Sequence, residues 1–236
     1  MKMFAKIRFY WGAFVISFIV AVLMIPAITI FPKYTGLIMH KLNSLIMLLM
    51  RAKADIIGKY DTDADMLLIN HQGIMDIVAI EAFRNHDICW VAKKELFETP
   101  WFGYIMKNSG MISLDRGSRS GLIKLLKDVK HKLGNEHRQI AIFPEGTRAK
   151  EQKLLKFKQG AQMIANKLNL KVQPVIVTGS KWVLNEHNRT GHSGTIHIEF
   201  LPTIEVAKSD DGWYDELYTT MQQKIDEQYN KNQIER

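Results

Sequence analysis

Short apolar runs alternate with segments of helical spacing along most of the chain. Six apolar runs have the length of buried strands: 66–69, 88–92, 111–114, 139–143, 172–177 and 195–201. Five further segments are expected to be helices: 77–83, 104–107, 122–133, 160–168 and the polar C-terminal 213–229. Pro174 removes a backbone donor from the fifth run, which favours an edge position or a bulge there. Strands that alternate with helices predict an α/β sheet with helices on both faces.

Three polar clusters follow predicted strands, where the loops of such a sheet form binding sites. They are His71 with Asp76, Asp115 with Arg116, and Glu145 with Arg148. Each also has a purely structural interpretation, as a surface pair or a pair that stabilises a turn. Their joint occurrence after strands favours a functional pocket.

The first cluster contains a histidine five residues before an aspartate. Five residues turn a helix by about 500°, so the two side chains do not share a helix face. If they meet, His71 lies in the turn after the strand and Asp76 in the first turns of the next helix. Such a histidine is a candidate general base whose second ring nitrogen is held by the carboxylate. With eight histidines in the chain, this spacing also arises by chance, so the pair alone is weak evidence.

No protein nucleophile accompanies this base in a recognisable motif. The spacing of a Gly-x-Ser-x-Gly elbow occurs at Gly117 and Gly121, but Arg119 stands in the middle. A substrate hydroxyl is then the expected nucleophile, as in direct acyl transfer. The two arginines suit a phosphate, because a guanidinium matches two phosphate oxygens at once.

The N-terminal region predicts contact with a membrane. Residues 9–31 are almost wholly apolar or small and are long enough to cross a hydrocarbon core of about 30 Å. A cleaved signal peptide is the main alternative. A second segment, 37–50, is expected either to lie at the interface or to pack on the soluble domain. Residues 1–51 are therefore expected to form an N-terminal membrane-anchoring helical pair, and 52–236 the catalytic domain.

Composition narrows the partners only slightly. The formal net charge of +8 suits an anionic membrane surface, phosphorylated substrates or nucleic acid. No aromatic-rich basic stripe supports nucleic acid, so none is expected as a partner. The single cysteine, Cys89, excludes an internal disulfide, and no cysteine and histidine cluster has the spacing of a zinc site.

Several motifs together resemble the lysophosphatidic acid acyltransferase family within the glycerolipid acyltransferases. Residues 70–76 match its Asn-His-x4-Asp block, and 143–148, Phe-Pro-Glu-Gly-Thr-Arg, match its third block in full. Residues 110–116 resemble the second block, Gly-x-x-Phe-Ile-Asp-Arg, with Ser113 where an aromatic is usual. The weak fourth block resembles 172–175. Order and spacing agree over about 66–177.

The resemblance implies a mixed, mostly parallel sheet flanked by helices, and an activity. His71 removes the proton from the sn-2 hydroxyl of 1-acylglycerol-3-phosphate, which attacks acyl-CoA or acyl-carrier protein to give phosphatidic acid without an acyl-enzyme. Asp76 orients His71. No cofactor or metal is implied, since the thioester is a co-substrate. The implied substrate-binding residues are Lys93, Arg116, Glu145, Gly146, Thr147 and Arg148.

Other functions are compatible with the same base and phosphate-binding residues. Glycerol-3-phosphate or another lysophospholipid is an alternative acceptor, and water as acceptor would make the protein a lysophospholipase. A non-enzymatic lipid-binding domain would leave His71 dispensable.

Topology gives one more hypothesis. Lys2, Lys6 and Arg8 favour a cytoplasmic N-terminus, and the thioester donors are cytoplasmic too. A single span does not place both the N-terminus and the catalytic domain in the cytoplasm. We therefore expect the N-terminal helical pair to enter only one leaflet, at the cytoplasmic face of the inner membrane.

Overall fold

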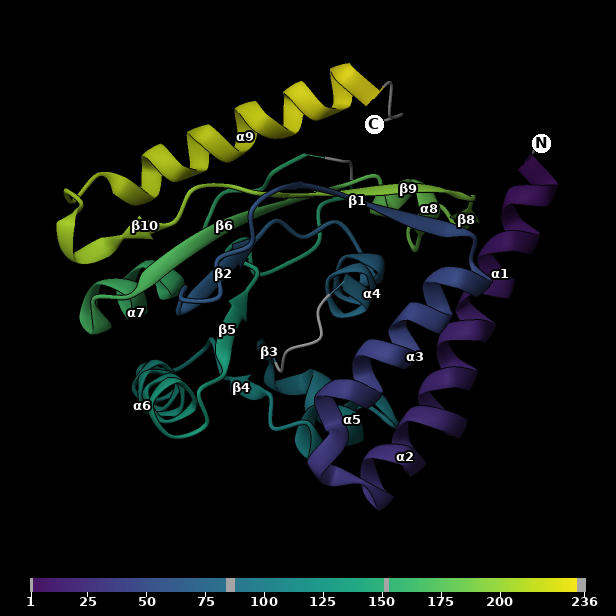
Figure 1. Ribbon diagram of the computed structural model, residues 1–236, viewed down its shortest axis with the longest axis horizontal. Helices are drawn as coiled ribbons and strands as arrows, with labels where there is room; N and C mark the ends of the chain where they lie inside the picture. Colours follow the sequence, from purple (N-terminus) through teal and green to yellow (C-terminus); the bar gives the residue numbers. More distant parts are fainter. Residues whose placement is uncertain (1, 84–87, 151–152, 233–236) are drawn as a thin grey trace.

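A central β-sheet with helices on both faces forms the body of the protein (Figure 1). The computed structural model describes residues 2–83, 88–150 and 153–232. The α-helices are α1 (Lys2–Phe18), α2 (Ile25–Ile30), α3 (Thr35–Leu49), α4 (Ile74–Phe83), α5 (Phe102–Asn108), α6 (Arg119–Asn135), α7 (Gln159–Leu168), α8 (Ser180–Val183) and α9 (Trp213–Asn232). A π-helical segment, η1 (Ile19–Met24), and three 3-10 segments, η2 (Pro32–Tyr34), η3 (Lys94–Glu98) and η4 (Val206–Lys208), complete the helical elements described. The strands are β1 (Ala52–Gly58), β2 (Met66–Ile69), β3 (Ile88–Lys93), β4 (Ile112–Leu114), β5 (Gln139–Ile142), β6 (Lys171–Thr178), β7 (Leu184–Asn185), β8 (Thr190–Gly191), β9 (Gly194–Phe200) and β10 (Ile204–Glu205).

The sheet is mixed and mostly parallel, as the resemblance implied. Its strand order is β1-β9-β6-β2-β5-β3-β4, with β10 beside β6. Strands β6, β2, β5, β3 and β4 run in one direction, whereas β9 and β10 are antiparallel to β6. The carboxyl ends of five parallel strands therefore lie along one edge of the sheet.

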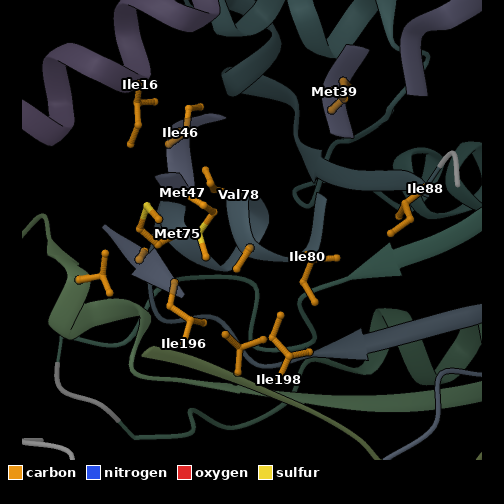
Figure 2. Close-up of a cluster of buried hydrophobic side chains, with 14 of the residues drawn as sticks. Ile16, Met39, Ile46, Met47, Met75, Val78, Ile80, Ile88, Ile196 and Ile198 are labelled. Carbon is orange, nitrogen blue, oxygen red and sulfur yellow. The ribbon is translucent and has the colours of Figure 1, made fainter. Parts of the chain in front are cut away.

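Strand β2 shows how the apolar pattern creates two cores. All four of its residues are buried, and successive side chains point to opposite faces. Leu67 and Ile69 join a core covered by the N-terminal helices and α4, part of which Figure 2 shows. Met66 and Leu68 join a second core covered by α6, α7 and α9. A strand buried on both faces has no polar side, which explains its continuous apolar run.

The six predicted strands are all present, each with ends within one residue of those expected. The predicted helices are present too, and they begin up to three residues earlier than the apolar spacing indicated. Strand β1 was not predicted. It lies at the edge of the sheet with most of its residues exposed or half-buried, so its sequence lacks an apolar run.

The edge position that Pro174 favoured is wrong. Strand β6 lies inside the sheet, between β9 and β2. Pro174 falls where the neighbour on one side of β6 changes from β10, which pairs with 171–172, to β9, which pairs with 175–178. A missing N–H is tolerated there because the ladder itself is interrupted at this residue.

The N-terminal helices pack on the rest of the protein rather than standing apart from it, and α1 lies against the short strand β8. Ile16, Ile19 and Ile28 are buried in the same core as Val78 of α4. Helix α3 packs on α4, as one of the two expectations for 37–50 had it, and Ile46 and Met47 lie beside Val78 in Figure 2. The interfacial position stays a prediction. The other side of the first helices is apolar and exposed.

Among the residues that the structure describes, one helical stretch has the length and apolar composition to cross a membrane. It comprises residues 2–30, and a third of its most apolar window is buried against the protein. Whether 1–51 and 52–236 act as separate units stays a prediction, but both contribute side chains to one core.

Candidate active site

The turn that carries His71 is fixed at both of its ends. Strand β2 ends at Ile69, and the Asn70 side chain then bonds to strand β6. Asn70 Oδ1 accepts from the Val177 backbone N–H at 2.7 Å, and Asn70 Nδ2 donates to the Val177 carbonyl at 2.9 Å. The buried Asn70 side chain thus makes the two backbone hydrogen bonds that a neighbouring strand would make, and it holds the turn against β6.

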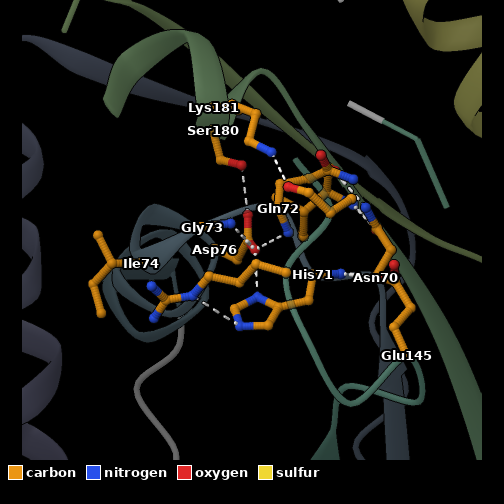
Figure 3. A network of polar contacts seen from close by, with 12 residues as sticks. Asn70, His71, Gln72, Gly73, Ile74, Asp76, Glu145, Ser180 and Lys181 are labelled. Atoms are coloured by element: carbon orange, nitrogen blue, oxygen red, sulfur yellow. Dashed lines mark hydrogen bonds and ion pairs between the residues drawn. The ribbon is translucent and has the colours of Figure 1, made fainter. Parts of the chain in front are cut away.

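His71 and Asp76 meet as the spacing required, with His71 in the turn and Asp76 in the first turn of α4. The distance between His71 Nδ1 and Asp76 Oδ2 is 2.9 Å (Figure 3). The same oxygen accepts from the backbone N–H groups of Gln72 and Gly73, at 2.6 and 2.8 Å. Asp76 therefore closes the amino-terminal turn of α4 while it holds the imidazole.

The plane and the free nitrogen of the imidazole are also defined. The ring stacks on Phe143, with centroids 3.8 Å apart and an interplanar angle of 14°, and Phe143 stacks in turn on Trp90. A carboxylate only accepts, so we assign the Nδ1 hydrogen to the bond with Asp76 and the lone pair to Nε2. Arg148 Nε lies 3.4 Å from that Nε2 atom and donates to it.

The loop after β5 is tied to the His71 turn by a buried carboxylate. Glu145 is 1% exposed; its Oε1 accepts from the His71 backbone N–H at 2.6 Å and its Oε2 from Leu155 N–H at 2.7 Å. Burial raises the pKa of Glu145 to about 8, because the cost of desolvating the carboxylate exceeds the help from these two donors and from Lys181. Glu145 thus fixes the backbone of the candidate base.

Gly146 and Arg116 bring the β4 and β5 loops together. Arg116 Nη1 donates to the Gly146 carbonyl. Gly146 has φ of +71°, and a Cβ there would lie 3.1 Å from the same guanidinium nitrogen. Only glycine suits both the backbone conformation and the close approach. Thr147 follows with an exposed side chain, next to Arg148.

Lys93 is the last residue of β3. It forms an exposed ion pair with Glu95 at 3.2 Å. The backbone N–H of Glu95 and the Lys93 ammonium hold the pKa of the Glu95 carboxyl below its usual value, and Arg116 adds to the effect. Within the parts of the chain that the structure describes, no hydrogen bond or ion pair joins Lys93 to His71. The predicted substrate residues thus line one edge of the sheet without all touching one another.

Three residues of the site were not predicted. Ser180 Oγ donates to Asp76 Oδ1 at 2.5 Å, and the buried Lys181 donates to the carbonyls of Ala149 and Lys150 in the loop after β5. Both follow strand β6, so the rule that polar residues after strands form sites would have found them. Glu186 Oε1 accepts from the Ile74 backbone N–H at 3.0 Å and from Arg148 Nη1 at 3.1 Å. Nothing local in the sequence indicates that role.

The described residues contain no cluster of three or more histidine, cysteine or acidic side chains that would hold a metal ion. The chemistry available at the site is that of a fixed imidazole beside arginine-bearing loops. Its components are a base with a lone pair, an orienting carboxylate and guanidinium groups.

Comparison with known proteins gives one consistent result. Residues 61–178, half of the chain, match the family model described as Acyltransferase. The chain is 39% identical over 176 residues to the 1-acyl-sn-glycerol-3-phosphate acyltransferase of Helicobacter pylori, a match that covers 74% of each protein. It is 31% identical over 152 residues to the protein of the same name from Escherichia coli, over 62% of this chain and 61% of that protein.

The fold is also similar to a solved structure. The crystal structure of the 1-acyl-sn-glycerophosphate (LPA) acyltransferase PlsC from Thermotoga maritima superposes with a TM-score of 0.79. The superposition covers 96% of this chain and 97% of that protein at 20% sequence identity. At this identity the likeness establishes a shared fold.

Proposed function

Because the chain belongs to the acyltransferase family that includes the 1-acyl-sn-glycerol-3-phosphate acyltransferases, we propose that it acylates the sn-2 hydroxyl of 1-acyl-sn-glycerol-3-phosphate. The product is phosphatidic acid, and the donor is a fatty acyl thioester, either acyl-CoA or acyl-carrier protein. The observation that carries the proposal is the His71–Asp76 pair at 2.9 Å, set beside loops that bear arginines.

The position of Ser180 supports direct transfer rather than an acyl-enzyme. Its hydroxyl is fully buried and donates to Asp76, on the side of the carboxylate away from His71. A nucleophilic serine has to face the nitrogen that takes its proton, which here is Nε2 of His71. Ser180 therefore orients the pair, and the attacking oxygen comes from the substrate.

In the proposed reaction, His71 Nε2 takes the proton of the sn-2 hydroxyl as that oxygen attacks the thioester carbonyl. The tetrahedral intermediate then collapses, the carbon–sulfur bond breaks, and the imidazolium returns the proton to the leaving thiolate. Asp76 stabilises the imidazolium and keeps the ring in place, with Phe143 against its face. General-base catalysis of this kind contributes roughly 10²- to 10⁴-fold.

The phosphate of the acceptor is proposed to bind between the loops after β4 and β5. Arg148 lies closest to His71, and Arg116 reaches the same loop through the Gly146 carbonyl. Lys93, Thr147 and Glu145 complete the proposed substrate-binding group, although both oxygens of Glu145 already accept backbone hydrogen bonds. Glu145 is proposed to act through the position of the loop.

The acceptor is a lipid, and we propose that the protein takes it from the cytoplasmic leaflet of the inner membrane. Phe4, Trp11, Phe14 and Phe18 of α1 are each 45% or more exposed, whereas the opposite side of the helix is buried. A helix with one side packed on the protein in this way presents its other, apolar side to a bilayer without crossing it. Labelling of an introduced cysteine between residues 31 and 37 from the far side of the membrane would contradict this topology.

An assay of membranes containing the protein tests the proposed function. Acceptors with and without a phosphomonoester, including glycerol-3-phosphate, are combined with acyl-CoA and with acyl-carrier protein. We expect phosphatidic acid from 1-acylglycerol-3-phosphate, and at least about 10²-fold less of it from the His71→Ala variant. If only another acceptor is acylated, that molecule is the substrate in place of 1-acylglycerol-3-phosphate. Release of free fatty acid from the lysolipid would indicate a lysophospholipase.

A further inference from the structure

Glu186 contacts the site from an element that lies outside the matched motifs. It follows β7, which pairs with β8 in a short hairpin. The turn after it is held by Asn185, whose Oδ1 accepts from the backbone N–H groups of His187 and Asn188 at 3.1 and 2.9 Å. A Cβ on Gly191 of β8 would lie 2.9 Å from the Phe9 backbone nitrogen, so the hairpin is packed tightly on α1. The position of Glu186 is therefore fixed by the fold.

The Glu186 carboxylate lies over the turn between His71 and α4. Its Oε1 accepts from the Ile74 N–H at 3.0 Å, and its Oε2 is 3.4 Å from where a Cβ on Gly73 would stand. The same Oε1 accepts from Arg148 Nη1 at 3.1 Å. The Nη1 end of the Arg148 guanidinium is thereby held by the Glu186 carboxylate.

The other end of the guanidinium covers the catalytic lone pair. Arg148 Nε donates to His71 Nε2 at 3.4 Å, which is the nitrogen that has to take the proton of the acceptor hydroxyl. With Arg148 in this position, the Nε2 lone pair already accepts a hydrogen bond and is not free to accept one from a hydroxyl or water. Catalysis requires that Arg148 move away from Nε2.

We propose that Glu186 is a positioning residue that holds Arg148 over His71 until the phosphate of the acceptor draws Arg148 away. This inference rests on the proposed function, because it assigns the phosphate ligand Arg148 a second, acceptor-free position. A phosphomonoester carries close to two negative charges near neutral pH and competes with the single charge of Glu186 for the guanidinium. The base is then uncovered only when the acceptor is bound.

The consequence of this arrangement is protection of the acyl donor. An uncovered His71 would take a proton from water, whose oxygen would attack the thioester carbonyl. The carbon–sulfur bond would break, and the products would be the free fatty acid and the protonated thiol. Glu186 suppresses this hydrolysis in the absence of acceptor.

The test compares wild type with Glu186→Gln, which keeps an oxygen for the Ile74 N–H and removes the charge. Thiol release from palmitoyl-CoA without acceptor is expected to rise about fivefold, the scale of a partly exposed ion pair. The KM for 1-acylglycerol-3-phosphate is expected to fall by up to about the same factor, since phosphate no longer competes with a carboxylate. Inorganic phosphate should stimulate hydrolysis by wild type and not by Glu186→Gln.

Asp128→Asn is the matched control, because it also neutralises one carboxylate of an ion pair, here one whose two members, Lys124 and Asp128, both lie on α6. It should leave both rates unchanged. Arg148→Ala should raise acceptor-free hydrolysis as well, and adding Glu186→Gln to it should have no further effect. Arg148→Ala alone keeps the proposal testable if Glu186→Gln fails to fold, which circular dichroism would show.

Two outcomes overturn the inference. Unchanged hydrolysis and KM in folded Glu186→Gln would make the ion pair a surface contact only. A raised acceptor KM would mean that Glu186 prepares Arg148 for phosphate instead of competing with it. Failure of the proposed function is seen separately, as absence of phosphatidic acid from wild type, while the hydrolysis measurement needs only the donor.

Discussion

Ser180 donates a 2.5 Å hydrogen bond to Oδ1 of Asp76, the carboxylate whose other oxygen holds His71. Asp76 is fully buried, and its Oδ2 also takes two backbone N–H groups of the turn before α4. The imidazole is thus oriented from the end of β6 as well as from its own helix. His71 and Asp76 therefore lie at the carboxyl ends of two adjacent parallel strands, β2 and β6.

The Ser180→Ala variant should therefore lower kcat. A hydrogen bond to a charged group is worth about 1.5–3 kcal/mol, and loss of part of it from the orienting carboxylate corresponds to about a tenfold decrease in kcat. The KM for acceptor should stay unchanged, since Ser180 is fully buried and does not face the substrate. Steady-state kinetics measure both. Ser209→Ala is the control, because that hydroxyl donates to the Glu205 carbonyl, away from the site. An equal loss of kcat in both variants would contradict the orienting role of Ser180.

His71→Ala and Asp76→Asn should separate the base from its orienter. His71→Ala should reduce acyl transfer by at least about 10², the scale of general-base catalysis, with the fold retained. Asp76→Asn should reduce kcat and also destabilise the protein, because Asp76 accepts two backbone hydrogen bonds that close the start of α4. Rates from folded protein and urea unfolding curves distinguish these effects. Wild-type rates in His71→Ala would remove the imidazole from the mechanism.

Glu145 should make stability depend on pH. Its pKa is raised from 4.5 to about 8 in the folded protein, so the unfolded chain ionises first as pH rises. The stabilisation from the neutral carboxyl is complete below pH 4.5 and is lost as pH rises towards 8. One pKa unit corresponds to about 1.4 kcal/mol, so the loss is on the order of 5 kcal/mol at most.

Glu145→Gln isolates this contribution, because other titrating groups cancel between the two proteins. The free energy of unfolding of wild type minus that of Glu145→Gln, from urea titrations, should fall between pH 4.5 and pH 8. A difference that rises with pH would show that the N–H groups of His71 and Leu155 keep the carboxylate ionised in the folded state.

Much of this site could be predicted from the sequence because one physical rule places it. Parallel strands buried on both faces are visible as apolar runs, and the residues that follow them share one edge of the sheet. That rule located His71, Asp76, Arg116, Glu145 and Arg148, and it also applies to Ser180. Glu186 escaped it because β7 has only two residues, and the position of its hairpin depends on packing against α1. Such a long-range contact leaves no local pattern.

The last prediction concerns Trp101, whose backbone has φ of +62° and ψ of −58°. A hydrogen bond of 2.7 Å from the Phe102 N–H to the Pro100 carbonyl closes this tight turn. A non-glycine residue in such a conformation costs about 1–3 kcal/mol, yet the side chain it carries is 56% exposed. Helix α5 follows directly, and its Tyr104 hydroxyl is 2.9 Å from Thr29 of α2. Trp101 therefore extends the exposed apolar side of the N-terminal helices, which we propose faces the bilayer.

Trp101→Gly should accordingly leave the fold stable and weaken membrane binding. Relief of the backbone strain opposes both the entropy cost of glycine and the loss of the buried part of the indole, so the free energy of unfolding should fall by no more than about 2 kcal/mol. An exposed half of a tryptophan surface is about 100 Å², worth about 2–3 kcal/mol when it enters an apolar phase, so partitioning onto phosphatidylglycerol vesicles should fall at least about tenfold. Ile123→Ala is the control, because Ile123 is 64% exposed on α6, which packs on the opposite face of the sheet from α1 and α2. Sedimentation with vesicles measures the partitioning. Equal binding by wild type and Trp101→Gly would place Trp101 outside the membrane contact.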